Sequence, residues 1–523
     1  MALLFNKLKQ SSTIILFNKF VNLFSDHKTL ALHLYALVLG LLVFLRMFDN
    51  SVWGDEGLVV LASRKNIEDL IAYVIYNGHS PFHYVVAWIF VKVFGESGFV
   101  FHLSASLPYF IILLLSTTII KRFFGIKTAI LFVTFSSLLK CAIIYNLEIR
   151  MYAWCSLFCL VCYLLSNRIY FTKQFKYYAL LGVFASLAAY THYFALASVG
   201  LIYCLILCKL FLEFKFSHFL EYGKFTISSG LFLVLFIPWI LYVKEVKQGV
   251  ITDYHIGSIS WSSCFQFIFY SSPKFLSLVL FYLWLLIPIA CYCKKFNLFK
   301  IINSKIDSDL IIKFNYKKLF YKFTLSNLNY WLLTGYVAVL GTITFSQVFS
   351  KLFFPITIHR YLYVSYIIAW LILAIELSSI CKSKRLFVLI LTAIFVLLSP
   401  YYVKTAYTEY KNNSLLSKTL EQTQPMITKN DLIYTDIVHF AWTVSESYYP
   451  NIPHNLFGHK EWWGPVSLPI LDKSKNFYLF LSNPISSELK ENLKHQAREY
   501  EILVENGYIG TGAVWVYKVP SVN

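Results

Sequence analysis

Residues 361–380 read YLYVSYIIAWLILAIELSSI and residues 385–402 read RLFVLILTAIFVLLSPYY, and only the segment CKSK at 381–384 separates them. Each run is close to the ~20 apolar residues that a helix needs to cross the hydrocarbon core of a bilayer. Apolar runs of this length are typical of membrane-spanning helices. The stretch therefore predicts two spanning helices joined by a short basic loop.

The rest of the chain repeats this pattern. Of its 523 residues, 58% are hydrophobic and 14% are charged, whereas soluble domains contain about 45–50% apolar and about 25% charged residues. This composition excludes an ordinary cytosolic enzyme and a disordered chain. The net charge of +19 does not indicate a nucleic-acid partner, because the basic residues lie in short loops between apolar segments. We expect eleven spanning helices, at about 30–47, 100–120, 127–145, 151–166, 177–191, 194–211, 225–243, 265–293, 329–347, 361–380 and 385–402.

The distribution of basic residues predicts the orientation of these helices. The loops on the side of the N-terminus hold 24 Lys and Arg residues, and the opposite short loops hold about 11. Since cytoplasmic loops carry the excess of Lys and Arg, the N-terminus is expected in the cytoplasm. Residues 1–29 then form a cytoplasmic amphipathic lead-in, and an odd number of spans places residues 403–523 outside the cytoplasm. We expect a bacterial inner membrane, although an endoplasmic-reticulum membrane would give the same topology.

The last 120 residues have a different pattern. Turn-forming Asn, Asp and Pro residues separate short apolar runs at 431–435, 476–481, 499–504 and 512–519, and helix-like segments lie at about 437–448 and 485–497. Strands that alternate with helices are typical of an α/β domain. The predicted fold is thus a polytopic α-helical membrane domain over 30–402, with a first external loop at about 48–99, followed by a small extracytoplasmic α/β domain over 403–523.

Two external loops carry charged residues at helix ends. The first contains Asp55 and Glu56 in the sequence WGDEG, and the second contains Glu148 and Arg150 in the sequence YNLEIRMY at 145–152. Asp55 could simply cap a helix, and Glu148 could pair with Arg150 to tie two helix ends together. Ionisable groups beside apolar helices are costly unless they are paired or used, so a functional role is the competing interpretation.

Further polar side chains are expected on the same face of the membrane. His79 and His83 lie four residues apart, which would place them on one helix face, and an aromatic belt is the simpler interpretation of His192 and Tyr193. Arg360 could extend to the headgroups or bind a phosphate through its guanidinium fork. Together, carboxylates that offer a general base and cations that neutralise an anionic leaving group indicate an active site at the external interface.

These motifs resemble those of the glycosyltransferase family that includes protein O-mannosyltransferases and bacterial aminoarabinose-lipid A transferases, the GT-C enzymes that use polyprenyl-phosphate sugars. The likeness extends in order and topology over residues 30–400. His102-Leu103 stands where the family usually has Arg-Leu, so the role of that Arg is not transferred. The matching elements are Asp55-Glu56, His79 with Pro81, Phe94-Gly95-Glu96, 146–152 (NLEIRMY), 191–194 (THYF) and 359–362 (HRYL).

The resemblance implies a GT-C-like fold and an inverting transfer of a sugar from a polyprenyl-phosphate donor to an acceptor hydroxyl, with Asp55 as the general base. Glu56 and Glu148 would orient the acceptor or join Asp55 around a divalent Mg²⁺ or Mn²⁺ ion, and whether an ion is needed is left open. The expected ligands of the donor phosphate are Arg360, Arg150 and Lys92. The expected substrate-binding residues are His79, His83, Tyr152, His192, Tyr193 and His359.

Other functions are compatible with the same residues. A lipid-linked glycan polymerase or ligase would transfer a chain rather than one sugar, and a flippase or secondary transporter would place its ionisable residues near the middle of the bilayer. A structural or receptor role for the C-terminal domain is also open. The expected partners are the lipid bilayer, a lipid-linked donor and a glycan, lipid or protein acceptor, and the sequence does not identify the sugar.

Overall fold

The computed structural model describes most of the chain. Residues 1–26 and 296–326 lie outside the described part, so the structure does not bear on most of the predicted lead-in 1–29 or on most of the lysine-rich loop before residue 327. The described residues are 27–48, 51–214, 219–246, 259–270, 274–295, 327–353, 355–381, 383–435, 441–456, 470–481, 484–509 and 512–522.

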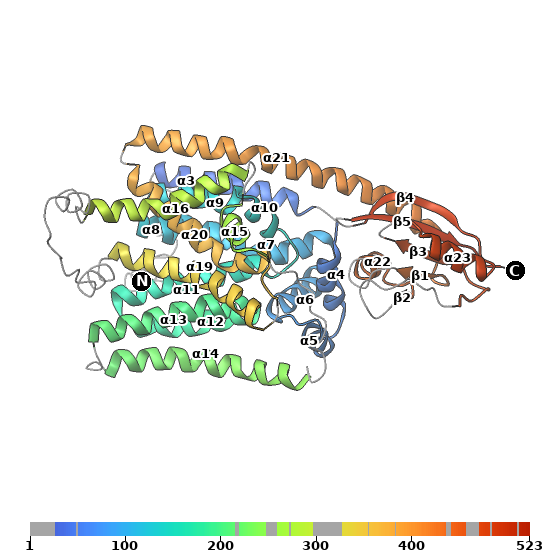
Figure 1. The fold of residues 1–523 in the computed structure, drawn as a ribbon, viewed down its shortest axis with the longest axis horizontal. Helices are drawn as coiled ribbons and strands as arrows, with labels where there is room; N and C mark the ends of the chain where they lie inside the picture. Colours follow the sequence, from blue (N-terminus) through green and yellow to red (C-terminus); the bar gives the residue numbers. More distant parts are fainter. Residues whose placement is uncertain are drawn as a thin grey trace, which may run out of the picture.

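The structure is an elongated helical body with a smaller sheet domain at one end (Figure 1). The end of the body nearer this domain is called the domain-facing end below. The long helices of the body are α3 (His27–Arg46), α7 (Gly98–Leu115), α11 (Tyr152–Thr172), α12 (Phe175–Thr191), α13 (Tyr193–Phe214), α14 (Phe219–Val246), α16 (Lys274–Lys295), α19 (Asn327–Leu352), α20 (His359–Ile380) and α21 (Lys384–Thr423).

Eight helices in the described residues are long and apolar enough to cross a membrane. The chain is therefore a polytopic helical membrane protein, and a total of eleven spans stays a prediction. Each of the eleven predicted segments overlaps a helix, but two of them are divided. The segment 127–145 forms α9 (Ile126–Leu138) and α10 (Lys140–Tyr145), and 265–293 forms α15 (Trp261–Ile268) and α16.

The two interruptions are connected to each other. Leu139 has an extended backbone, with ψ of 142°, and the next amide, that of Lys140, donates to the carbonyl of Tyr270 at 2.8 Å. Lys140 Nζ also donates to Tyr270 Oη at 2.6 Å. The backbone groups released where one helix breaks are thus paired with the chain just after α15, a contact that apolar periodicity does not encode.

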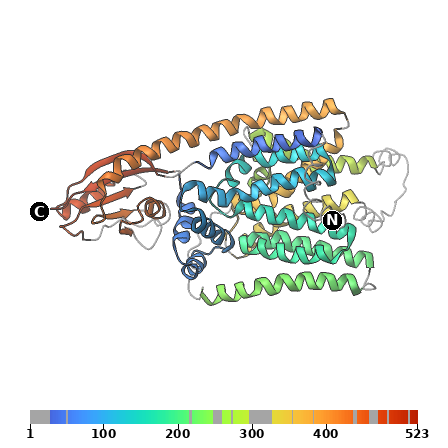
Figure 2. The same cartoon turned by 180° about the vertical axis from the view of Figure 1, so that it is seen from behind.

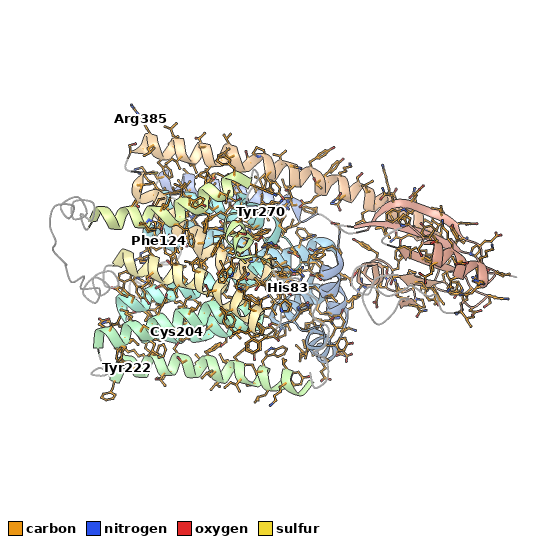
Figure 3. The ribbon with its side chains drawn as sticks, in the orientation of Figure 1. His83, Phe124, Cys204, Tyr222, Tyr270 and Arg385 are labelled. Carbon is orange, nitrogen blue, oxygen red and sulfur yellow. The ribbon has the colours of Figure 1, made fainter. Side chains whose placement is uncertain are left out.

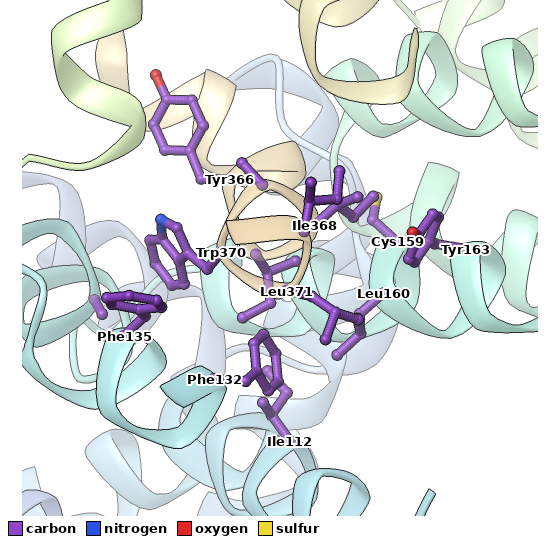
Figure 4. Packing of buried hydrophobic residues seen from close by; sticks show 14 of the residues in the cluster. Ile112, Phe132, Phe135, Cys159, Leu160, Tyr163, Tyr366, Ile368, Trp370 and Leu371 are labelled. Atoms are coloured by element: carbon purple, nitrogen blue, oxygen red, sulfur yellow. The ribbon is translucent and has the colours of Figure 1, made fainter. Parts of the chain in front are cut away.

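Helix α20 forms the centre of the body. From Leu362 to Leu377 every residue of this helix is buried. Figure 4 shows Trp370 and Leu371 of α20 among side chains of α9 and α11, including Phe132, Phe135 and Leu160. Because α20 is covered on all sides, its first residues, His359 and Arg360, are held at a fixed position at the domain-facing end.

Helix α21 connects the body to the sheet domain. It extends for 40 residues from Lys384 to Thr423, through Pro400, and is therefore about 60 Å long. It passes the predicted domain boundary at residues 402 and 403 as one continuous helix. Figures 1 and 2 show it along one edge of the body and on into the sheet domain, where it packs against the strands. The segment from 403 to 423 is a helical extension of the last predicted span.

The sheet has five strands in the order β2-β1-β3-β5-β4. β1 is parallel to β2 and β3, and β5 is antiparallel to β3 and β4. β3 alternates between two apolar clusters, because Tyr478 and Phe480 pack with Leu416 of α21, and Leu479 and Leu481 pack with Leu489 of α23. The bounds are β1 (Leu432–Thr435), α22 (Ala441–Tyr448), β2 (His454–Leu456), β3 (Phe477–Leu481), α23 (Ser487–His495), β4 (Glu501–Ile509) and β5 (Gly512–Val519).

Three short helices cover the domain-facing end of the body: α4 (Gly54–Arg64), α5 (Ile67–Tyr76) and α6 (Phe82–Phe94). All three lie in the predicted first loop, and α6, with 13 residues, is too short to span a bilayer. Figure 1 shows α4 on the side of the body that faces α22. Short helical segments are η1 (Ser116–Ile120), α8 (Lys121–Phe124) and η2 (Gln424–Met426).

Candidate active site

Asp55 and Glu56 lie in the first turn of α4. Carboxylates are favourable there because the free amides at a helix N-terminus carry partial positive charge. Glu56 Oε2 accepts a hydrogen bond from the backbone N–H of Trp53 at 3.2 Å, which is the return half of a capping box. Local sequence therefore sets the direction of this helix and presents Asp55 at its start.

Glu56 also joins the two predicted loops. Its second carboxylate oxygen, Oε1, accepts from the backbone N–H of Ile149 at 2.8 Å, although the two residues are 93 positions apart. Glu56 is buried, and both of its oxygens bind backbone amides. Its carboxylate is thus committed to holding the loop at 146–151 against α4.

Asp55 forms an ion pair with Arg360, the second residue of α20. The distance from Arg360 Nη1 to Asp55 Oδ2 is 2.5 Å, and the two side chains are 28% and 21% exposed. Arg360 also lies over the ring of Trp53, 5.7 Å from its centroid. The pair brings together two motifs separated by about 300 residues, and its partial exposure leaves it open to a ligand.

Arg150 is more deeply buried than Arg360. It is 2% exposed, and its Nη1 donates to the carbonyl of Asp55 and to the hydroxyl of Tyr84, each at 3.0 Å. Its Nη2 lies 3.4 Å from His79 Nε2. The Arg150 guanidinium therefore binds the backbone of Asp55, while Arg360 binds its carboxylate.

A turn at Gly78 places His79 beside Arg150. The amides of Gly78 and His79 donate to the carbonyls of Ile75 and Val74, and Gly78 has φ of 75°. This pattern is a Schellman motif, in which glycine adopts the left-handed conformation at low cost. The chain leaves α5 so that the His79 ring stacks near Tyr84.

A cavity of about 420 Å³ opens beside the ion pair. Its polar lining includes Glu56, Glu148 and Arg360, together with Arg46, Glu409 and Asn412. Glu409 belongs to α21 and binds Arg46 through both carboxylate oxygens. The cavity thus lies between the first loop, α20 and the start of the extended part of α21.

Glu148 has an unusual environment. Burial raises its pKa to about 7, against the opposing effect of Arg360 and Arg150. Burial and the same two arginines lower the pKa of His192 to about 3, so this imidazole is neutral at physiological pH. Among the described residues, the buried atoms at this site without a hydrogen-bond partner include Glu148 Oε2, Arg150 Nε, Tyr152 Oη and Arg360 Nε.

The other predicted site residues are placed as follows. His192 lies between Tyr361 and Tyr152, 4.9 and 6.1 Å from their ring centroids, and its Nδ1 accepts from the amide of Phe194 at 3.1 Å. Tyr193, the next residue, starts α13 and is partly exposed.

Three predicted residues have different surroundings. His83 is fully buried in α6, where burial lowers its pKa to about 3. The ring of His359 stacks on Phe267. Lys92 lies nine residues after His83, at the exposed end of α6, over the ring of Trp88. Lys92 was expected at the donor phosphate and His359 at the substrate; in the structure both lie against aromatic rings, and neither is assigned a role below.

The three carboxylates do not converge on one point. Asp55 pairs with Arg360, and Glu56 binds two backbone amides. No group of three or more His, Cys, Asp or Glu side chains in the described residues is arranged to hold a metal ion. The divalent ion stays an expectation from the sequence, and no step below passes through a metal.

Sequence reasoning missed several contributors. Tyr84 holds Arg150, and Arg46 and Glu409 close one side of the cavity. Arg46 and Glu409 are 363 positions apart, so spacing gives no signal for their contact. An Arg at the end of one apolar run and a Glu just beyond another were the only available indications.

No family model matches this sequence, and no curated protein does. Among solved structures, ArnT from Cupriavidus metallidurans in the apo state matches with a TM-score of 0.56 and 12% identity, over 93% of this chain and 97% of that one. The same ArnT bound to undecaprenyl phosphate matches with a TM-score of 0.54 and 12% identity, over 92% and 97% of the two chains. The likeness includes nearly the whole length of both proteins, and the chain thus has the fold of ArnT.

Proposed function

We propose that this protein is a membrane glycosyltransferase that moves one sugar from a polyprenyl-phosphate donor to an acceptor hydroxyl at the extracytoplasmic face. The observation that carries the proposal is the Asp55–Arg360 ion pair beside a cavity lined by Glu148. A carboxylate that can accept a proton and a guanidinium that can bind a phosphate are thereby held within one contact distance of each other.

To bind Arg360, the donor phosphate has to displace Asp55 from its ion pair. A phosphate that enters beside Arg360 competes with Asp55 for the guanidinium, because both anions prefer the same planar fork of N–H groups. Binding of the donor would therefore release the Asp55 carboxylate at the time when it is needed as a base. The unpartnered Arg360 Nε offers a further donor to the phosphate.

The transfer step is a single inverting displacement. The acceptor O–H gives its proton to Asp55, and the acceptor oxygen forms a bond to the anomeric carbon from the face opposite the phosphate. The bond between that carbon and the phosphate oxygen breaks, and the electron pair leaves with the polyprenyl phosphate, whose charge Arg360 stabilises. As in glycoside hydrolysis, the transition state has oxocarbenium character, which nearby carboxylates stabilise.

The remaining residues of the site hold these two in place. Arg150 binds the Asp55 carbonyl and Tyr84, so we assign it to positioning rather than to the donor phosphate. Glu56 keeps the second loop against α4 through the amide of Ile149. Glu148, with its pKa near 7, faces the cavity and would bind acceptor hydroxyls, together with the polar wall of Arg46, Glu409 and Asn412.

The fold supports a lipid-linked donor. One of the ArnT structures that share this fold is bound to undecaprenyl phosphate. Sugars on polyprenyl phosphates are also the form suited to chemistry at a membrane face, because the lipid keeps the donor in the bilayer while the sugar reaches the interface. We infer that the domain-facing end, where the charged residues gather, is the extracytoplasmic one, as the distribution of Lys and Arg predicts.

The test compares the envelope glycans of four strains by mass spectrometry: wild type, a strain without the protein, Asp55→Asn, and Asp69→Asn as the matched control. Asp69 is an exposed residue of α5 in the same loop, where it binds Asn66. The proposal expects one glycan to lose a single sugar mass without the protein and in Asp55→Asn, at wild-type abundance, while Asp69→Asn keeps it.

Three other outcomes would contradict the proposal. Retention of the sugar in Asp55→Asn would remove the assigned base and turn attention to Glu148. Accumulation of complete lipid-linked intermediates would indicate a flippase or a polymerase. Loss of a whole chain, rather than one sugar, would indicate a ligase.

A further inference from the structure

The sheet domain contacts the helix that carries Asp55. We propose that Tyr448 and Arg64, which join α22 to the two ends of α4, are positioning residues that hold Asp55 in its reactive place. The inference rests on the proposed function, in which Asp55 is the general base. It makes the sheet domain a part of the catalytic apparatus.

The first contact is at the start of α4. The backbone N–H of Val52 donates to the hydroxyl of Tyr448 at 2.9 Å. Val52 is buried and lies three residues before Asp55. The Tyr448 ring also packs against the apolar cluster that contains Val52, Val59 and Leu70. One side chain of the sheet domain therefore supplies both a hydrogen bond and apolar contact to the segment that leads into the site.

The second contact is at the other end of the same helix. Arg64 is the last residue of α4, and its Nη1 and Nη2 donate to the carbonyls of Glu446 and Ser447 at 2.9 and 2.8 Å. These carbonyls belong to the last turn of α22, where helix carbonyls have no partner within the helix. A guanidinium is a favourable partner there, since the C-terminal end of a helix carries partial negative charge.

Arg64 also reaches a third element. Its Nη2 pairs with Glu96 Oε1 at 2.6 Å, and Glu96 lies in the turn between α6 and α7. The guanidinium therefore fixes α4 to α22 on one side and to the body on the other. Because Glu96 supplies the opposing charge, Arg64 stays oriented toward α22.

The two contacts together fix the orientation of a rigid element. α4 has 11 residues and is about 16 Å long. With α22 attached at both ends, α4 cannot tilt about either one, and the backbone of Asp55 stays at a fixed place beside the start of α20. Displacement of a reacting group by about 1 Å can lower a rate by about 100-fold, so contacts outside the cavity can control the reaction.

The experiment removes the contacts one at a time in the full-length protein. Tyr448→Phe keeps the ring in the apolar cluster and removes only the hydroxyl that accepts the Val52 amide. Arg64→Lys keeps the positive charge but cannot bind two carbonyls and Glu96 together. The matched control for the first variant is Tyr76→Phe, because Tyr76 lies in the same loop and is 68% exposed. Each variant is purified in detergent and assayed with a polyprenyl-phosphate sugar, and hydrogen–deuterium exchange is followed over residues 51–57.

We expect a kcat that is roughly 5- to 10-fold lower in Tyr448→Phe and in Arg64→Lys, because each removes one or two hydrogen bonds that fix α4. The KM for the donor should stay within about twofold, since neither residue contacts the cavity. Amide exchange over 51–57 should be faster in both variants and unchanged elsewhere. Tyr76→Phe should match the wild type in all three measurements.

Two results would overturn the inference. One is an unchanged kcat with unchanged exchange over 51–57, while Asp55→Asn is inactive, and the proposed function would then stand without it. The other is faster exchange throughout the chain with a lower melting temperature, which would indicate a general structural role. If Asp55→Asn keeps full activity, the proposed function fails first, and a positioning role for Asp55 fails with it even where the local exchange is faster.

Discussion

The charged side chains at the two ends of the helical body differ in burial and in pairing. At the end opposite the sheet domain, where Figure 3 labels Tyr222 and Arg385, the ion pairs among the described residues join lysine to glutamate. Glu213 contacts Lys173 and Lys209 at 2.5 and 3.3 Å, and Glu221 contacts Lys224 at 2.7 Å. Glu213 is partly exposed, and its contact with Lys173 joins the end of α11 to α13, whereas the Lys209–Glu213 and Lys224–Glu221 contacts lie within α13 and within α14.

At the domain-facing end, near His83 in Figure 3, the charges are more deeply buried and less completely paired. Glu148 and Arg150 are both buried, yet Glu148 Oε2 and Arg150 Nε have no hydrogen-bond partner among the described residues. Burying a charged group without full pairing costs free energy. Under the proposed function, the charges at the domain-facing end keep binding capacity for a ligand, whereas those at the opposite end stabilise the fold.

The largest expected effect is that of Asp55→Asn, which keeps the size of the side chain and removes the base. We expect kcat in the purified enzyme to fall by about 10²- to 10⁴-fold, with little change in melting temperature. The measurement is single-sugar transfer with a short-chain polyprenyl-phosphate donor. Asp69→Asn is the control, and a reduction below about tenfold in Asp55→Asn would place the base elsewhere.

Arg360→Gln should have the next largest effect. The amide can still donate to Asp55 but cannot neutralise a phosphate, so we expect kcat/KM for the donor to fall by about 10- to 100-fold. Arg385→Gln, at the exposed opposite end, is the control and should keep at least half of the activity. An unchanged kcat/KM in Arg360→Gln would show that the leaving phosphate is stabilised by another group.

Glu148→Gln tests whether the incompletely paired carboxylate of Glu148 lowers the stability of the folded protein. Because the folded-state pKa is about 7 and the ordinary value is 4.5, the folded protein binds this proton more tightly than the unfolded chain does. Stability from this group is fully present below about pH 4.5 and is lost as the pH rises through about 7. Glu148→Gln mimics the protonated form, so its melting temperature should exceed that of the wild type by about 1–3 °C at pH 8.

The same comparison at about pH 4.5 should show no difference between Glu148→Gln and the wild type. A variant that is less stable than the wild type at pH 8 would show that the ionised carboxylate is a stabilising partner of the two arginines. The charge of Glu148 would then stabilise the fold, as the lysine–glutamate pairs do at the opposite end.

Glu213→Gln at the opposite end should have the smallest effect. Partly exposed ion pairs contribute about 1 kcal/mol or less, so we expect a slightly lower melting temperature and a transfer rate within about twofold of the wild type. Thermal unfolding and the same transfer assay check both. A loss of activity comparable to that of Arg360→Gln would remove the distinction between the two ends.

Much of the fold is encoded locally. Long apolar runs predicted the positions of the body helices, and short apolar runs between turn-forming residues predicted four of the five strands, from DLIYT at 431–435 to GAVWVYKV at 512–519. The three-residue strand β2 (His454–Leu456) was missed because it depends on its pairing with β1 rather than on its own sequence. The same applies to the break at Leu139, which is stabilised by the distant Tyr270.

The candidate site was predictable in its residue types and not in its contacts. The sequence placed Asp55, Glu148 and Arg360 on one face, but it offered a Glu148–Arg150 pair as the simplest structural interpretation. In the structure Asp55 forms an ion pair with Arg360, and Arg150 donates hydrogen bonds to the backbone carbonyl of Asp55 and to the hydroxyl of Tyr84. Side-chain partners over such separations are chosen by tertiary packing, which one sequence without its fold does not display.

The continuity of α21 has a consequence for how this protein can change in length. Each residue inserted into a helix turns everything beyond it by about 100° and moves it by about 1.5 Å. One extra residue between 403 and 415 would therefore swing α22 to another side of the body and take Tyr448 away from Val52, whereas seven would nearly restore the angle but raise the domain by about 10 Å. The number of residues between 403 and 415 thus sets both the distance of the sheet domain from the helical body and its rotation about the axis of α21. Each residue inserted there is expected to change both by a fixed amount, unlike an insertion in a loop.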